Sequence, residues 1–423
     1  MASNFDNFSD VVKRFVRYVQ VETTSSEEST STPSTACQLD LLRMLRDELK
    51  TIVPEGSSVE LDEKTGVLLA RVPGTPDLRS EKSIGLLAHV DTSCEAPGKN
   101  VRPQLHTVPS AGGLEVGHGV TIMEETLKPY VGEQIITSDG STLLGADDKA
   151  GVAAVVTTLE KMQSLPSRPN IVAIFTPDEE VGRGTENVDP AVLLERENML
   201  CAYTVDGGEV GQLEWENFNA KRATVTFQGV SAHPGEFGKL IVNSLLLGAE
   251  FCTLLPEDKR PDTSCGERDG FIYVTGMHGG CEETTVKMIL RSFDVEELEA
   301  LEAVVRETAD KVAKAHPRSS VRTEVAWQYH NMKEKMLPLA VENGRAAFRA
   351  VGVEPVEHGI RGGTDGARLT EGGLPTPNLF AGGLNFHSRA EFVPVKSLEK
   401  ACEACVALVS VWGQHFLSAK QQQ

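Results

Sequence analysis

Three consecutive acids, Asp178, Glu179 and Glu180, directly follow an apolar run in the stretch "NIVAIFTPDEE", residues 170–180. An apolar run of this length, bounded by turn residues, is typical of a strand that is buried on both faces. In open α/β sheets, ligands bind at the carboxyl ends of the strands. The acids are therefore expected at a position where side chains could bind a ligand or take part in catalysis. It is unusual that three of them are adjacent there.

The same design recurs at other places in the chain. Ligand-type residues follow or end apolar runs at His89 and Asp91 in "LLAHVD", at Asp147 in "LLGADDKAG" and at Asp206 in "YTVDGG". A later candidate, His387 in "GGLNFHSRAEF", could by itself be a surface histidine. Because strand ends gather at one sheet edge, we expect such residues to converge although they are far apart in sequence.

Each of these residues also has an ordinary structural interpretation. A histidine at a strand end is more often a structural hydrogen-bonding group than a ligand. Asp147 and Asp148 precede a helical pattern, where an acid is a good N-cap. Capping needs only one acid, so the other carboxylate could reach a metal. The spacing of His89 and Asp91 places both on one face of a strand, where Asp91 can orient the imidazole.

Taken together, the candidates form a set of ligands that suits zinc. The set comprises three carboxylates and two imidazoles: His89, Asp147, Glu180, Asp206 and His387. If Asp147 bridges two ions, each ion receives three protein ligands and keeps positions open for water and substrate. Two Zn²⁺ ions, the carboxylates and one hydroxide are then formally neutral, which explains how the acids can share an interior site.

The elements that must position these residues alternate between strands and helices. Strand-like runs at 83–91, 170–180 and 201–208 and a helix from Asp148 to about Leu165 favour an α/β domain with a largely buried sheet. The Gly- and Pro-rich segment 96–143 is too long for an idle loop and is expected to carry small elements of its own.

A different pattern begins at about Asn217. Strands at 222–229, 270–280, 284–294 and 320–329 and helices at 240–255 and after Asp294 give the order β-α-β-β-α-β, which is the ferredoxin-like arrangement. We therefore predict an inserted α+β domain at 217–330, between the parts 1–216 and 331–423 of the α/β domain.

Composition narrows the classes of partner. The net charge of −20 disfavours nucleic acid and anionic membrane surfaces as partners. No apolar run approaches the ~20 residues of a membrane span, and the N-terminus has no signal-peptide pattern. Eight scattered cysteines in a chain of 423 residues suggest reduced thiols, so we expect a cytoplasmic protein.

The motifs "HVD", "GADDKAG", "TPDEEVG" and "YTVDGG", followed by a distal histidine, resemble the M20 family of co-catalytic zinc peptidases. Further stretches, among them "GKNVRPQ", "LEWENFNA" and "IRGGTDGARL", are similar to its peptidase T branch of tripeptide aminopeptidases. The resemblance covers nearly the whole chain. It implies a zinc-peptidase catalytic domain with a mixed central sheet, and it makes the inserted domain a lid. Lids of this family can dimerise, which allows a homodimer through the lid.

The resemblance also implies a distribution of the ligands over two zinc ions. His89, Asp147 and Asp206 would hold one ion, and Glu180, Asp147 and His387 would hold the other.

Further roles follow from the same pattern. Glu179 would be the general base and Asp91 would orient a ligand histidine. His233 of the lid would polarise the scissile carbonyl, and Arg291 and Arg361 would bind the substrate carboxylate. A water acidified by the ions would attack the peptide carbonyl after Glu179 takes its proton.

Three hypotheses about function stay open from the sequence. The first is an aminopeptidase that releases the N-terminal residue from tripeptides. The second is another M20 amidohydrolase, such as a dipeptidase, deacylase or carboxypeptidase. The third is a catalytically inactive binding protein on the same fold, which the retention of Glu179 and of the complete ligand set argues against.

Overall fold

The computed structural model describes residues 5–262, 266 and 268–422. The chain divides into two compact units, which we describe separately. Unit 1 comprises residues 1–215, 334–358 and 364–423, and unit 2 comprises residues 216–333 and 359–363. Among the described residues, no helix combines the length and the apolar character needed to cross a membrane.

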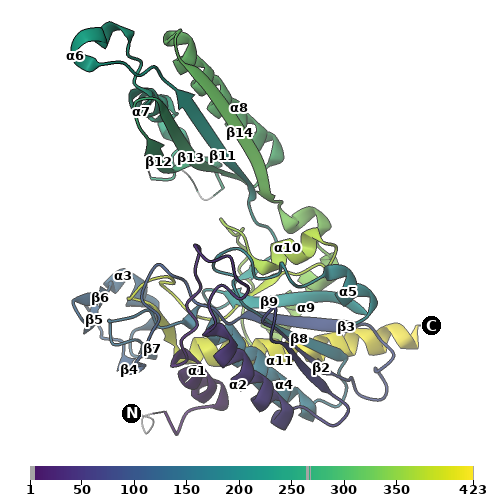
Figure 1. Ribbon diagram of the computed structural model, residues 1–423. Helices are drawn as coiled ribbons and strands as arrows, with labels where there is room; N and C mark the ends of the chain where they lie inside the picture. The colour runs from purple at the N-terminus through teal and green to yellow at the C-terminus, as the bar shows by residue number, and fades with distance from the viewer. Residues whose placement is uncertain (1–4, 263–265, 267, 423) are drawn as a thin grey trace. The chain divides into compact units, whose positions relative to one another are not determined.

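Unit 1 is built on a mixed sheet with the strand order β1-β2-β8-β3-β9-β15-β10 (Figure 1). Its parallel centre consists of β8, β3, β9 and β15, and the antiparallel neighbours β1, β2 and β10 extend both edges. The strands are β1 (Ser58–Asp62), β2 (Val67–Val72), β3 (Ser83–His89), β8 (Asn170–Thr176), β9 (Met199–Gly207), β10 (Leu213–Glu214) and β15 (Asn378–Phe380). The α/β class and the mixed central sheet expected from the sequence are confirmed.

Helices cover both faces of this sheet, which explains why its central strands are continuous apolar runs. On one face, α4 packs against β3 and β9, and α1 and α11 pack against α4 (Figure 1). On the other, Leu193 of α5 and Leu369 of α10 join strand residues such as Leu87 and Ile174 in one apolar cluster. The helices of unit 1 are α1 (Asp10–Val19), α2 (Gln38–Ile52), α4 (Ala146–Lys161), α5 (Pro190–Glu195), α9 (Pro338–Ala350), α10 (Asp365–Glu371) and α11 (Val395–Gln421).

The long segment before α4 carries small elements of its own, as its length predicts. It contributes β4 (Gln104–Thr107), β7 (Gln134–Thr137), the hairpin of β5 (Leu114–Gly117) and β6 (Val120–Ile122), and the short helix α3 (Glu124–Leu127). A small sheet of order β16-β7-β4 pairs this segment with β16 (Phe392–Pro394) near the C-terminus. Phe392 and Ile135 pack in the apolar core of this region.

Unit 2 contains an antiparallel sheet of order β12-β13-β11-β14, with α7 and α8 packed against it (Figure 1). Its elements are β11 (Asn219–Gln228), α6 (Pro234–Phe237), α7 (Ser244–Leu254), β12 (Phe271–Gly279), β13 (Glu283–Ser292), α8 (Val295–Ala315) and β14 (Ser320–Tyr329). This order of strands and helices is the ferredoxin-like arrangement. Residues from both layers, including Phe227, Phe251 and Leu301, form its core.

One helix of unit 2 begins later than the sequence pattern suggests. The apolar run predicts a helix from residue 240, whereas α7 begins at Ser244. The Asn243 side chain accepts a hydrogen bond from the Leu245 amide at 3.0 Å and caps the helix there. Of the preceding residues, Leu240 ends a short 3-10 turn and Val242 forms an isolated antiparallel bridge with Val230.

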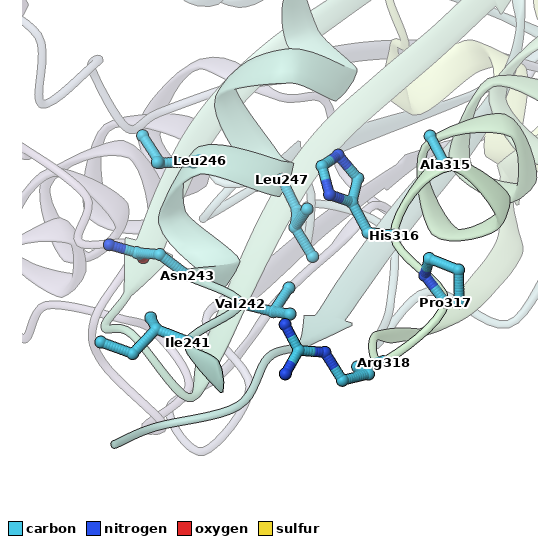
Figure 2. Close-up of a pocket in the computed structure, with 9 residues that line it drawn as sticks. All are labelled: Ile241, Val242, Asn243, Leu246, Leu247, Ala315, His316, Pro317 and Arg318. Carbon is cyan, nitrogen blue, oxygen red and sulfur yellow. The ribbon is translucent and has the colours of Figure 1, made fainter. Parts of the chain in front are cut away.

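A cavity of about 300 Å³ lies between the start of α7 and the turn after α8 (Figure 2). Its lining is largely apolar, and its polar side chains already have partners within the unit. His316 contacts the Glu250 carboxylate at 2.9 Å, and Arg318 donates to the Lys239 carbonyl at 2.8 Å. These contacts give the polar groups structural roles within unit 2.

Candidate functional site

Three parallel strands of unit 1 end side by side and deliver polar residues to one edge of the sheet. His89 is the last residue of β3 and pairs in register with Thr176, the last residue of β8. Asp206 lies near the end of β9, the neighbour of β3 on its other side. The carboxyl ends of these strands therefore bring together residues that are far apart in sequence.

The first group of possible metal ligands consists of His89, Asp147 and Asp206. The His89 Nε2 atom lies 3.0 Å from Asp147 Oδ1 and 3.4 Å from Asp206 Oδ1. His89 is buried, and both carboxylates are partly buried.

The second group consists of Asp147, Glu180 and His387. The His387 Nε2 atom lies 2.7 Å from Glu180 Oε2 and 3.3 Å from Asp147 Oδ2. Asp147 thus directs one carboxylate oxygen to each group. Glu180 Oε1 is buried and has no hydrogen-bond partner among the described residues, although a buried carboxylate oxygen normally has one.

Asp91 binds three groups of the site at once. Its Oδ1 lies 3.2 Å from His89 Nδ1, which leaves Nε2 of the imidazole directed at the carboxylates. The same carboxylate accepts hydrogen bonds from the amides of Glu179 at 3.0 Å and Glu180 at 3.2 Å. Asp91 therefore orients the histidine and also holds the turn that carries both glutamates, a contact that the sequence pattern does not reveal.

Asp147 and its neighbour Asp148 have different partners at the start of α4. Asp148 is fully buried, and its carboxylate accepts from the Gly151 amide at 3.1 Å and from the His89 amide at 3.2 Å. Asp148 thus acts as the capping acid, while Asp147 faces the two histidines. A side chain at position 151 would collide with the Asp148 carboxylate and the Val205 carbonyl, so glycine is required there.

A buried acid missed from the sequence, Glu391, holds the loop that carries Asp147. Its Oε2 accepts from the amides of Leu144 and Gly145, both at 2.7 Å, and its Oε1 accepts from the Asp147 amide at 3.0 Å. Glu391 is 1% exposed and lies four residues after His387. One short segment thus supplies a possible ligand and fixes the backbone of another. A lone acid before a short apolar run gives no sequence signal for this role.

The pKa values reflect the crowding of acids. Burial raises the pKa of Asp206 to about 8 and that of Glu180 to about 7. Hydrogen bonds to Asp147 and Glu180 raise the pKa of His387 to about 11. Burial opposes ionisation of Asp147, but hydrogen bonds from His387 and His89 outweigh it and lower the pKa of this carboxyl. Without a metal, protonated imidazoles are thus the cations that compensate these acids.

Glu179 belongs to neither ligand group, although it adjoins both. Burial, and then the nearby charges of Asp206, Asp365 and Glu180, raise the pKa of the Glu179 carboxyl well above its usual range. Asp365, another acid whose role the sequence pattern does not reveal, is buried and accepts a hydrogen bond from Thr176 Oγ1 at 2.8 Å. A carboxyl group with a raised pKa is suited to accept a proton and to return it during a reaction.

The two ligand groups fit divalent metal ions. Zinc bonds to nitrogen and oxygen measure about 2.0–2.2 Å, so ligand atoms around one tetrahedral ion lie about 3.4 Å apart. The 3.0 and 3.4 Å separations around His89 Nε2 are close to this spacing. A cation would also give the buried Glu180 Oε1 a partner. Donor types, spacing and uncompensated charge all agree with metal binding.

The remaining candidates, His233, Arg291 and Arg361, belong to unit 2. His233 is exposed and precedes α6. Arg291 is nearly buried; its Nη1 donates to the carbonyls of Leu290 at 3.0 Å and Lys221 at 3.3 Å. Arg361 Nη1 donates to the Gly266 carbonyl at 2.6 Å, and its guanidinium lies 5.2 Å from the centre of the Phe218 ring.

Comparison with known proteins agrees with this geometry. The model of peptidase family M20/M25/M40 matches residues 123–410, which include most of the possible ligands. A curated relative, peptidase T of Parabacteroides distasonis, is 41% identical over 411 residues, covering 95% of this chain and 98% of the relative. The chain belongs to peptidase family M20. The family model is one of peptidases and the relative is named peptidase T, so the chain is a hydrolase that acts as a peptidase.

Solved structures show that this fold is shared. The aminopeptidase PepT from Bacillus cereus superposes with a TM-score of 0.73 at 24% identity, covering 95% of this chain and 98% of that one. A tripeptidase from Staphylococcus aureus gives a TM-score of 0.74 at 20% identity, with 96% and 98% covered. A dinuclear metal-binding M20 peptidase from Bacillus subtilis gives 0.64 at 13% identity, with 95% and 98% covered.

Proposed function

We propose that this M20 peptidase is a metallo-aminopeptidase that removes the N-terminal residue from tripeptides. The observation that carries the proposal is the pair of ligand groups that share Asp147, with the unligated Glu179 beside them. The peptidase T relative at 41% identity over nearly the whole chain supports the reaction class, as do the names of the aminopeptidase and the tripeptidase with the same fold.

We propose zinc as the metal, with two ions for each chain. His89, Asp147 and Asp206 would hold one ion, and Asp147, Glu180 and His387 the other. Mixed nitrogen and oxygen ligands suit zinc, and three protein ligands for each ion leave positions open for water and substrate. When bound, the ions supply Lewis acidity, which lowers the pKa of a water molecule and polarises a carbonyl.

The protein's own residues would then transfer the protons and orient the reacting groups. Glu179 would take a proton from the attacking water and return it to the leaving amine, so that one carboxyl serves as base and then as acid. Asp91 would keep the glutamates and His89 in place through its three hydrogen bonds. Positioning of this kind contributes to rate because misplacement of a proton acceptor by about 1 Å can slow a reaction about 100-fold.

Unit 2 would contribute to substrate recognition in this proposal. The family pattern assigns His233 to the scissile carbonyl oxygen and Arg291 and Arg361 to the substrate carboxylate. It also makes this unit a lid, whose closure would exclude water from the reaction. A homodimer through the lid and a cytoplasmic location stay predictions, to be tested by sedimentation and by cell fractionation.

A substrate panel tests the proposed function. Zinc-reconstituted and metal-free protein would be given tri-alanine, di-alanine and N-acetylated tri-alanine. The proposal expects the zinc form to release the N-terminal alanine from tri-alanine, with little turnover of the acetylated peptide. Equal turnover of the acetylated peptide would exclude an aminopeptidase and favour another M20 amidohydrolase. Absence of turnover on all three peptides would favour the inactive binding protein.

A further inference from the structure

Asp178, the first acid of the "DEE" run, has an unusual backbone conformation and no place in either ligand group. Its φ angle is +60°, in the left-handed region that non-glycine residues seldom occupy, and its side chain is only 1% exposed. Such a conformation persists only where the surrounding contacts hold it. The contacts of Asp178 therefore bear on the placement of its neighbour Glu179.

Asp178 forms a reciprocal pair with the fully buried side chain of Gln38. The Gln38 Nε2 donates to Asp178 Oδ1 at 2.7 Å, and the Asp178 amide donates to Gln38 Oε1 at 3.1 Å. The remaining oxygen of Asp178 accepts from the Ser34 amide at 2.7 Å. The end of the Ser/Thr-rich segment 22–35 and the start of α2 are thus bonded to the turn after β8.

The same turn is held from its other side. The amides of Glu179 and Glu180 donate to Asp91, and the Arg183 amide donates to the Asp178 carbonyl at 2.9 Å. Glu179 therefore stands between two anchors. Asp91 fixes its amide, and the pair with Gln38 fixes the residue before it.

The Ser/Thr-rich segment connects these two anchors. The Ser25 amide donates to the Thr92 carbonyl at 3.1 Å, and the Thr92 amide donates to the Thr23 carbonyl at 3.2 Å, directly after Asp91. Further along the same segment, Ser34 binds Asp178. One stretch of chain thus links both supports of the turn that carries Glu179.

We propose that Gln38 and Asp178 are positioning residues, which hold the Glu179 carboxyl in place for proton transfer. The inference rests on the proposed function of Glu179 as the general base. It gives the Ser/Thr-rich segment a role in catalysis through its backbone contacts, without contact to the substrate. Asp178 acts here chiefly through hydrogen bonds, and its Oδ2 also lies 3.8 Å from Arg183 Nη2. Exchanging donor and acceptor between the two side chains should therefore preserve most of its effect.

The decisive experiment reverses the direction of one hydrogen bond. Gln38→Glu places a second carboxyl group opposite Asp178, and the two can ionise together only with strong repulsion. The variant is therefore measured at a pH high enough to remove any proton that the pair shares. In the double variant Gln38→Glu with Asp178→Asn, the new side-chain amide at position 178 can donate to the new carboxylate at position 38. The backbone amides of residues 34 and 178 keep their acceptors. At saturating zinc, we expect the single variant to lower kcat by about 10- to 100-fold with KM unchanged, and the double variant to recover most of it.

A measurement that does not depend on activity accompanies the kinetics. Hydrogen–deuterium exchange of peptides spanning residues 177–183 should be faster in Gln38→Glu and return toward the wild-type rate in the double variant. Gln163→Glu introduces the same charge at an exposed position and is the matched control, expected to match the wild type in both measurements. Gln38→Met is measured beside Gln38→Glu, because methionine can neither take up a proton nor accept a hydrogen bond from the Asp178 amide. It removes both hydrogen bonds to Asp178 and the two to the Ser34 and Thr35 hydroxyls, and it should show the same changes.

Two results would overturn the inference. One is unchanged exchange in residues 177–183 of the single variant, whatever its activity. The other is a variant whose melting temperature falls while kcat for each zinc-loaded molecule stays at the wild-type value, because Gln38 then only stabilises the fold. Failure of the proposed function gives a different result. The wild-type protein would then not cleave tripeptides, and the exchange rates would still show whether Gln38 and Asp178 hold the turn.

Discussion

The two units differ in how their buried charged side chains are compensated. In unit 2, the nearly buried Lys221 donates to Glu299 at 2.5 Å and to Glu302 at 2.7 Å, and its ammonium lies 4.6 Å from the centre of the Trp327 ring. At the sheet edge of unit 1, acids outnumber the side chains that could compensate them. Buried charges are tolerated when paired. The difference indicates that the buried lysine of unit 2 is compensated within the unit, whereas the acids at this edge of unit 1 are suited to bind cations from solution.

The largest effect is expected from Glu179, the glutamate that the proposed function leaves without a metal ion. Glu179→Gln should reduce kcat for tri-alanine by about 10²- to 10⁴-fold because it removes the proton acceptor. Zinc content, measured by elemental analysis, should stay at the wild-type value. Glu180→Ala changes the neighbouring residue and is the matched variant. It should bind one equivalent of zinc instead of two. If both variants keep their zinc and differ little in rate, the distribution of roles between the two residues is wrong.

A smaller effect, on zinc affinity, is expected from Glu391, whose carboxylate binds the backbone of the loop that carries Asp147. Glu391→Gln loses one of its two accepting oxygens, so at least one amide among Leu144, Gly145 and Asp147 loses its partner. Loss of support behind a ligand typically lowers metal affinity about 10- to 100-fold. Competition with a fluorescent chelator measures this affinity, and Glu403→Gln on the exposed face of α11 serves as the control. Unchanged zinc affinity would limit Glu391 to a role in folding.

Proton competition should give zinc binding a definite pH dependence. The pKa of His387 is raised to about 11 by hydrogen bonds to Asp147 and Glu180, so at neutral pH the metal-free protein holds a proton on this imidazole. Zinc must displace that proton, and the apparent affinity should therefore rise with pH, by about tenfold per unit for one proton. Calorimetric titrations in two buffers of different ionisation enthalpy would count the released protons. An affinity that does not change between about pH 6 and 8 would contradict this linkage.

The smallest effect is expected in unit 2. Lys221→Met leaves Glu302 without its buried partner and should destabilise the protein by about 1–2 kcal/mol, since one of the two bonded glutamates is half exposed. Zinc content and the KM for tri-alanine should not change. Thermal unfolding measures the loss, with Lys287→Met on the exposed face of β13 as the control. Loss of zinc from the Lys221 variant would show that the two units do not differ as proposed.

Much of the site could be predicted because its residues stand at strand ends. The strands β3 and β8 are almost wholly buried, so their sequences are apolar along most of their length. The polar residues that follow therefore mark the strand ends. The rule that parallel strands present their carboxyl ends at one edge then suffices to bring His89, Glu180 and Asp206 together. Residue type and position along a strand carry this information.

The supporting contacts could not be predicted in the same way. Glu391 binds backbone amides that lie 244 or more residues away, and any sequence supplies such amides. Gln38 meets Asp178 only because α2 packs where the turn after β8 ends. The late start of α7 depends on a single capping residue, Asn243, within an apolar run. Long-range hydrogen bonds and local caps leave no periodic signal in the chain.

Zinc titration of the metal-free protein tests most directly whether the acids of unit 1 are assembled for cations. Wild-type protein should bind two equivalents per chain, and its hydrolysis of tri-alanine should rise as they fill. Glu180→Ala should retain one equivalent, held by His89, Asp147 and Asp206. A wild-type protein that binds no zinc, or a Glu180→Ala variant that binds two equivalents and keeps full activity, would contradict the account.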